Sequence, residues 1–146
     1  MTKQVRELTA AESWRRLRGI SLGRIVFSMR ALPAIRPASH LVDEGDIIIR
    51  GHPDSPVGNA AGQVVAYEAD EFDPGAHLGW SVVMTGLATA IDDPADTARY
   101  ELLLRPWVRR AMNSLVRITP EIVTGYEVVA ETEFGGPVPG DLSDVS

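Results

Sequence analysis

Apolar runs rich in β-branched residues recur along the chain, and Gly, Pro, Asp or Glu residues separate them. Such runs are typical of short strands. Seven segments show the pattern: residues 23–29, 31–42, 46–51, 63–70, 79–93, 114–119 and 121–130. About six strands in one compact chain, with a hairpin near the front, predict a small β-barrel rather than a sandwich.

A helix is predicted near the N-terminus. Thr9 is followed three residues later by Glu12, which is the spacing of a capping box, and the segment ends at Gly19. Its apolar residues recur at helical spacing, so we expect Trp14 to anchor the helix in the core.

A second helix is predicted for residues 92–104. Asp93 would cap it and Pro94 would occupy its first position. The acidic, Gly- and Pro-rich tail of residues 131–146 has little to bury, and we expect it to be disordered. Residues 1–130 then form a single domain.

Composition narrows the functional classes. The chain has 146 residues, a formal charge of −6 and no cysteine, which argues against a broad nucleic-acid surface and excludes disulfides and thiolate chemistry. The N-terminus lacks the apolar core of a signal peptide, and no apolar run reaches the ~20 residues of a membrane span. We therefore expect a cytoplasmic protein that binds neither nucleic acid nor membrane.

The predicted hairpin at residues 35–52 collects positively charged side chains. If residues 43–45 form its loop, Val42 faces Asp46, and alternate side chains share a face. One face then holds Arg36, Ala38, His40, Ile48, Arg50 and His52. The other face reads as core and holds Ile35, Pro37, Ser39, Leu41, Ile47 and Ile49.

Two guanidinium groups and two imidazoles so close together favour an anion. That anion is either a ligand phosphate or the carboxylates of surface Asp and Glu residues. The loop after Arg50 is rich in glycine and contains Ser55, so it could add phosphate donors, although it lacks the P-loop pattern. The three histidines show no metal-ligand spacing, and no nucleophile elbow is present.

Several blocks together resemble a known family. They are "ALPAIRPASHLV", "DIIIRG", "VVAYEADEFDP", "GWSVVMTGLA", "RPWV" and "VRITPEIVTG". In content, order and spacing they are similar to the pyridoxamine 5′-phosphate oxidase-like flavin-binding proteins, in the small branch that includes nitroimidazole-resistance-type proteins. The resemblance runs from about Leu8 to Val129.

The resemblance implies a mostly β, six-stranded split barrel with flanking helices. It also implies a homodimer that holds flavin mononucleotide (FMN), or in some branches the deazaflavin F420 or haem, at the subunit interface. Arg50 matches the arginine that grips the phosphate, Ser55 a phosphate-loop residue, and Trp107 a residue that reaches the cofactor from the partner. The remaining cofactor-binding candidates are Arg36, Pro37, Ala38, Ser39, His52, Trp80 and Ser81.

The chain departs from that family at two places. Gly51 and Pro56 stand where relatives that bind flavin tightly often carry threonine and lysine. Losing one charged hydrogen bond would cost about 1.5–3 kcal/mol, or roughly tenfold or more in affinity. The Arg36 and His52 cluster could compensate, or the site could have drifted toward another ligand. Trp80 either borders the cofactor groove or packs against the other subunit.

With a flavin bound, the protein needs no catalytic residue of its own, because the cofactor carries the redox chemistry. The first hypothesis is therefore a flavin-dependent oxidoreductase that acts on a small molecule. The second is a non-catalytic protein that holds a flavin, F420 or haem, and the third is a homodimer that has lost its ligand.

Overall fold

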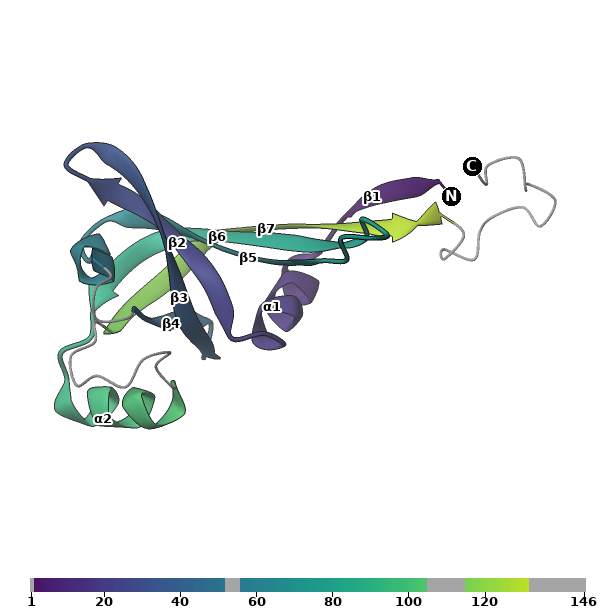
Figure 1. Cartoon of the computed structure of the whole chain (residues 1–146). Coiled ribbons are helices and arrows are strands. Elements are labelled where there is room, and N and C mark those ends of the chain that lie inside the picture. The colour runs from purple at the N-terminus through teal and green to yellow at the C-terminus, as the bar shows by residue number, and fades with distance from the viewer. Residues whose placement is uncertain (1, 52–55, 105–114, 132–146) are drawn as a thin grey trace.

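The computed structural model describes residues 2–51, 56–104 and 115–131 (Figure 1). In chain order the elements are β1 (Lys3–Glu7), α1 (Ala10–Arg18), β2 (Leu22–Met29), β3 (Leu32–Asp43), β4 (Asp46–Arg50), the 3₁₀ helix η1 (Pro56–Ala60), β5 (Val64–Phe72), β6 (Gly79–Ala90), α2 (Pro94–Leu103) and β7 (Leu115–Ala130). The tail predicted to be disordered lies outside these residues from position 132 onward.

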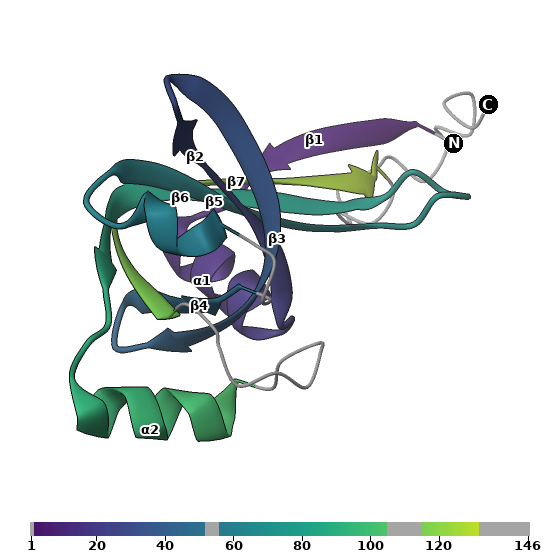
Figure 2. The same cartoon turned by 60° about the vertical axis from the view of Figure 1, so that its left-hand side comes forward.

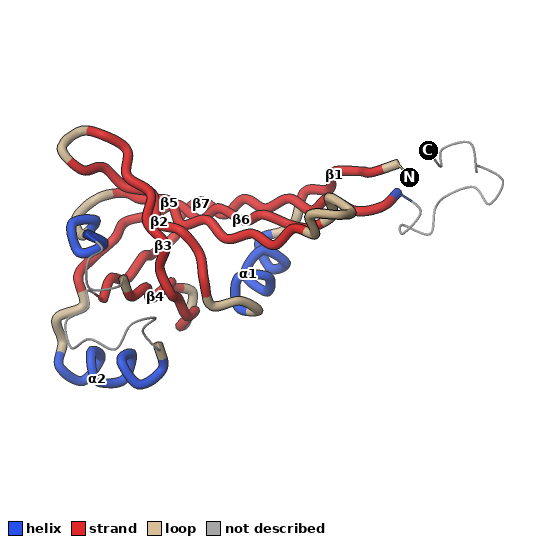
Figure 3. The backbone as a smooth tube through the Cα atoms, viewed as in Figure 1, coloured by secondary structure: helices blue, strands red, loops and turns tan. Residues whose placement is uncertain are grey.

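Six of the described strands close into a barrel. Neighbouring strands follow the order β7, β4, β3, β2, β5 and β6, and β6 also pairs with β7. Beyond the barrel, β5, β6 and β7 continue as a long ribbon, and β1 pairs along the far part of β7 (Figures 1 and 3). The predicted mostly β, six-stranded split barrel is confirmed, whereas β1 was not predicted.

The closing strand β7 is continuous where the sequence predicted two strands separated at Pro120. Its register with β6 shifts between Thr85 and Gly86, and Pro120 lies opposite Gly86. A bulge of this kind accommodates a proline, which cannot donate a ladder hydrogen bond. Gly86 allows the close approach, because a Cβ there would come within 2.7 Å of the Pro120 Cα.

Helix α1 begins as its sequence predicts. The Thr9 hydroxyl accepts from the Glu12 N–H at 3.1 Å, and the Glu12 carboxylate accepts from the Thr9 N–H at 3.0 Å. That backbone N–H is the main reason why the pKa of Glu12 falls to about 2, and the Arg6 guanidinium adds to the effect. Trp14 packs against the main core, as expected, and Leu17 is fully buried.

The β3–β4 hairpin corrects the predicted register by one residue. Asp43 pairs with Asp46, so the loop contains only Glu44 and Gly45, both at positive φ (49° and 82°). Two consecutive residues of this kind form the tight turn that matches strand twist. His40 consequently faces Ile49, and Ser39 faces Arg50.

This slip separates the predicted cationic cluster, because side chains of adjacent strand residues point to opposite faces. Ala34, Ala38 and His40 on β3 are buried in the main core with Ile47 and Ile49, whereas Ile35 is 58% exposed. The prediction therefore chose the wrong face of β3 as the core face. It was right for β4, where Ile47 and Ile49 are buried as predicted.

The described residues form two apolar clusters. The larger fills the barrel and extends beneath α1, with Ile25, Tyr67 and Met84 fully buried. The smaller lies outside the barrel, where Tyr100 of α2 and Leu104, directly after the helix, pack on Ile48 and Leu115. Figure 2 shows α2 along that outer side, next to β4. Helix α2 therefore covers the strand end that carries Arg50.

Candidate functional site

The residues that sequence analysis nominated fall into two regions. Arg36, Pro37, Ala38 and Ser39 lie on β3 and Arg50 ends β4, whereas Trp80 and Ser81 begin β6. His52, Ser55 and Trp107 lie outside the described residues. The two regions meet different parts of β7, because Arg50 pairs with Leu115 and Trp80 pairs with Glu127.

These two pairing positions on β7 are far apart. They are 12 residues apart (127 − 115 = 12), which corresponds to roughly 40 Å along a strand. The structure therefore does not bring Trp80 next to Arg50 within one chain. Ser81 points to the face of the ribbon opposite Trp80, because adjacent strand residues alternate.

Arg50 is a buried guanidinium beside the C-terminus of α2. It is 7% exposed, its Nη1 donates to the Leu104 carbonyl at 2.7 Å, and its Nη2 lies 3.7 Å from the Glu101 carboxylate. Its Nε has no hydrogen-bond partner among the described residues. Ser39, the directly opposed residue on β3, is 8% exposed. A buried cation with an orphaned donor beside a hydroxyl can accept an anion there.

Arg36 does not join Arg50. It belongs to the opposite face of β3, and its Nη1 donates to the neighbouring Ile35 carbonyl at 2.9 Å. Pro37 is half-buried on the same face as Ser39, and Ala38 is fully buried in the barrel. Among the members of the predicted cationic cluster that the structure describes, Arg50 alone lies beside the β3 residues of the outer face.

A hydrogen-bond network fixes α2 over this region. The Tyr100 hydroxyl donates to the Asp43 carboxylate at 2.5 Å, and Arg99 donates to the same carboxylate at 3.2 Å. The Tyr100 bond is the main reason why the pKa of Asp43 is lowered. Arg117 on β7 donates to the Tyr100 hydroxyl and to Asp46. Residues of the β3–β4 turn therefore hold α2, and α2 covers Arg50.

His40 has a structural environment inside the barrel. It is 3% exposed, its Nδ1 lies 2.6 Å from the Tyr67 hydroxyl and its Nε2 lies 2.9 Å from the Leu17 carbonyl. Because a carbonyl only accepts, Nε2 carries the proton in the neutral ring. Burial lowers the pKa of His40 and raises that of Tyr67. His40 thus ties α1 to the barrel and also borders a cavity of about 510 Å³.

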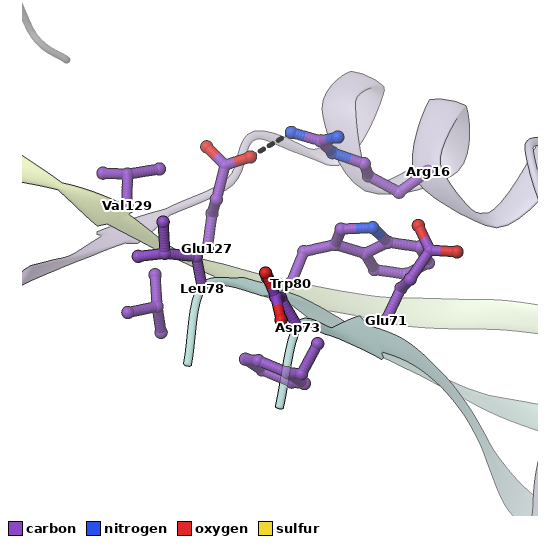
Figure 4. Close-up of a pocket in the computed structure, with 10 residues that line it drawn as sticks. Arg16, Glu71, Asp73, Leu78, Trp80, Glu127 and Val129 are labelled. Carbon is purple, nitrogen blue, oxygen red and sulfur yellow. Dashed lines mark hydrogen bonds and ion pairs between the residues drawn. The ribbon is translucent and has the colours of Figure 1, made fainter. Parts of the chain in front are cut away.

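Trp80 lies beneath α1 on the ribbon and is 6% exposed. A second cavity of about 430 Å³ opens beside it, between Arg16 of α1 and the ends of β5, β6 and β7. Figure 4 shows Trp80 between Glu71 and Glu127, with Arg16 reaching from the helix to Glu127. Arg6 also donates to Glu127, at 2.8 Å.

Two features that bear on function are absent from the described ranges. No group of three or more His, Asp or Glu side chains gathers there in a way that could hold a metal ion. Neither α-helix found in those ranges is long and apolar enough to span a membrane.

The fold agrees with a comparison against known families. The sequence profile described as pyridoxamine 5′-phosphate oxidase matches residues 9–127. The chain therefore belongs to this family, as the resemblance had indicated.

Individual relatives support the same assignment. The chain is 50% identical over 136 residues to the uncharacterized protein Rv0080 of Mycobacterium tuberculosis, which covers 89% of this chain and 90% of that protein. It is similar to a putative pyridoxamine 5′-phosphate oxidase from Corynebacterium glutamicum (33% identity, TM-score 0.70, 87% and 95% coverage). It is also similar to the FAD binding protein from Mycobacterium smegmatis (31% identity, TM-score 0.65, 84% and 95% coverage).

Sequence reasoning missed several residues that shape these regions. Tyr67 and Tyr100 looked like ordinary strand and helix positions, and only the folded chain shows which partners their hydroxyls meet. Glu71 directly follows the strand predicted for residues 63–70, and its pairing with Trp80 places it on the cavity side of the ribbon. The sequence signal for this position was the alternation of inward and outward side chains along the strand, which continues through residue 71.

Proposed function

We propose that this chain binds a flavin nucleotide through Arg50 and serves as a flavin-dependent oxidoreductase. The carrying observation is the buried Arg50 guanidinium, whose Nε has no partner among the described residues and which lies opposite Ser39. Family membership and the similarity to a mycobacterial FAD binding protein support the choice of ligand. The phosphate would accept from Nε, and Ser39 would add a hydroxyl donor.

A bound flavin would supply the hydride or electron transfer, and the chain would bind and orient it. FMN, FAD and the deazaflavin F420 share a phosphorylated ribityl chain and differ in the ring system or in what is attached beyond the phosphate. The proposal assigns only that shared phosphate to Arg50. The geometry that supports this phosphate contact involves only Arg50 and Ser39, on β4 and β3. The proposal therefore applies equally to FMN, FAD and F420.

A second candidate is a carrier that holds the flavin without turning over a substrate. The side chain of Glu101 is the only acidic group among the described contacts of Arg50, and it is 43% exposed. This arrangement supplies no evident acid or base near the proposed phosphate. Reduction of the bound flavin by NADH or NADPH, followed by reoxidation with turnover, separates an enzyme from a carrier.

The direct test is flavin binding by the purified protein. Visible flavin absorption should co-purify or appear on titration with FMN, FAD or F420. Arg50→Met should weaken flavin affinity at least tenfold, because it removes a charged hydrogen bond worth about 1.5–3 kcal/mol. Since Arg50 also donates to Leu104, this variant could loosen α2 as well.

Arg99→Gln provides the matched control for that side effect. Arg99 holds α2 through Asp43 and Tyr100 but makes no contact with Arg50. It should leave flavin affinity within about threefold of the parent, since loss of an exposed ion pair costs only ~0.2–1 kcal/mol. Equal flavin affinity in Arg50→Met and the parent would remove Arg50 from the site.

A further inference from the structure

The carboxylate of Glu101 lies beside the guanidinium to which the proposed function assigns a phosphate. Its Oε2 is 3.7 Å from Nη2 of Arg50, which is beyond hydrogen-bond distance. Nη1 of the same guanidinium donates to two backbone carbonyls at the end of α2, those of Glu101 at 3.4 Å and Leu104 at 2.7 Å. Within the described part of the chain, Nε has no partner and Nη2 has only the loose ion pair with Glu101, so this side of the guanidinium is available to a ligand.

Helix stability does not account for a carboxylate at position 101. The residue lies in the last turn of α2, where the helix dipole disfavours a negative charge. Its side chain is 43% exposed, whereas the Arg50 side chain beside it is 6% exposed. A carboxylate that is unfavourable for the helix but lies against a buried cation is explained if it sets the charge that this cation can accept.

The pair formed by Arg50 and Glu101 carries no net charge. A guanidinium alone attracts a doubly charged phosphate more strongly than a singly charged one, whereas a neighbouring carboxylate repels the doubly charged phosphate more strongly. Loss of water also costs a dianion more than a monoanion. Because Glu101 offsets the attraction of Arg50, the cost of losing water decides between the two, and it favours the smaller charge.

We infer that Glu101 makes this site select a phosphate that carries one negative charge over a phosphate that carries two. A phosphate that is linked at both ends, as in FAD and F420, carries one charge on each phosphorus, whereas a monoester such as FMN carries nearly two above pH 7. The favoured ligands are therefore flavins with a doubly linked phosphate. This inference rests on the proposed contact between Arg50 and a flavin phosphate, and it adds the residue that determines specificity.

Two flavins with the same ring system test the inference by fluorescence titration of the full-length protein at pH 8. FMN offers a monoester, and riboflavin 4′,5′-cyclic phosphate offers a diester with one negative charge. Glu101→Gln should raise the affinity for the cyclic phosphate about threefold and the affinity for FMN about tenfold, because the repulsion that it removes is proportional to the ligand charge. Comparing the two gains cancels the difference in shape between the flavins.

Two more variants separate this inference from the proposed function. Glu7→Gln removes the same charge from an exposed position on β1, which pairs with the far part of β7, and should leave both affinities unchanged. Arg50→Met should weaken the binding of both flavins. If it does, but Glu101→Gln changes both affinities by the same factor or weakens them, only the role of Glu101 is overturned. If neither flavin binds, or if Arg50→Met binds both like the parent, the proposed phosphate contact fails and this inference fails with it.

Discussion

The buried imidazole of His40 makes stability depend on pH in a defined direction. Burial lowers the pKa of His40 below the ordinary 6.5, so the unfolded chain binds more protons than the folded chain as the pH falls below that value. Its contribution to the free energy of unfolding is therefore present above about pH 6.5 and lost at lower pH. We expect thermal denaturation scans to show a falling melting temperature from pH 7 to pH 5.

His40→Gln isolates this effect, because an amide can still donate to Leu17 and accept from Tyr67 but does not titrate. Its stability should vary less with pH below 6.5 than that of the parent. Glu68 titrates in the opposite sense: burial and the neighbouring Asp70 raise its pKa to about 7, so its contribution is lost as the pH rises. Glu68 is present in both proteins, so its titration cancels when the stability of the variant is subtracted from that of the parent. Identical pH profiles of stability would contradict the role assigned to His40.

Gly125 is required where α1 crosses β7. A Cβ at this position would overlap the Ser13 hydroxyl and come within 3.1 Å of Val82 Cγ1 and 3.2 Å of Leu8 Cδ1. Gly125→Ala should lower the free energy of unfolding by about 1–3 kcal/mol, the usual cost of overpacking, as measured by chemical denaturation.

Two further variants show whether the clash is the cause. Gly75→Ala places its Cβ in ordinary contact, with the nearest atom 3.5 Å away, and should change stability little. Combining Gly125→Ala with Ser13→Gly removes the clashing hydroxyl and should recover part of the loss. Purely additive effects in the double variant would point to a different cause.

At the scale of elements, sequence patterns specified the helices and strands better than they specified which faces meet. The capping box at Thr9 and the cap at Asp93 are local signals, and both are present in the structure. The β3–β4 register depends on whether the turn contains two residues or three. That one-residue difference moved His40 from the predicted ligand face into the core.

The candidate site was predictable only in part for the same reason. Arg50 was found because it ends a strand before a glycine-rich loop, but its contact with Leu104 depends on α2, which lies 54 positions later in the chain. The cavity beside Trp80 requires β5, β6, β7 and α1 together. No local pattern at Trp80 specifies such an assembly.

The β3–β4 turn also contains removable strain. Glu44 has φ 49°, a left-handed conformation that costs most L-residues roughly 1–2 kcal/mol but that asparagine tolerates better. Glu44→Asn should therefore raise the free energy of unfolding by up to ~1 kcal/mol, measured by urea denaturation. Glu44→Gln keeps the conformational cost and should not stabilise; a gain in that control would assign the effect to charge instead.

At the scale of the whole molecule, the outer face of the barrel and ribbon is unusually apolar for a surface. Ile35, Val26, Ala66, Thr85 and Ile122 are opposed in register across five neighbouring strands. Ile35 and Ile122 are 58% and 59% exposed, and on the same face Val64 is 70% exposed. Contiguous exposed apolar surface of this kind is typical of an interaction site.

We propose that this face pairs with itself in a homodimer, because a two-fold contact brings one patch against its own copy. Sedimentation velocity should give a dimer, and Ile35→Glu or Ile122→Glu should shift it toward monomer. Leu32→Glu is the control: Leu32 is 67% exposed and lies on β3 as well, but an odd number of residues from Ile35 and hence on the opposite face. If the flavin also binds between subunits, the two dissociating variants lose flavin affinity and Leu32→Glu retains it. A protein that is monomeric at all concentrations, or that remains dimeric in both isoleucine variants, would contradict the proposed interface.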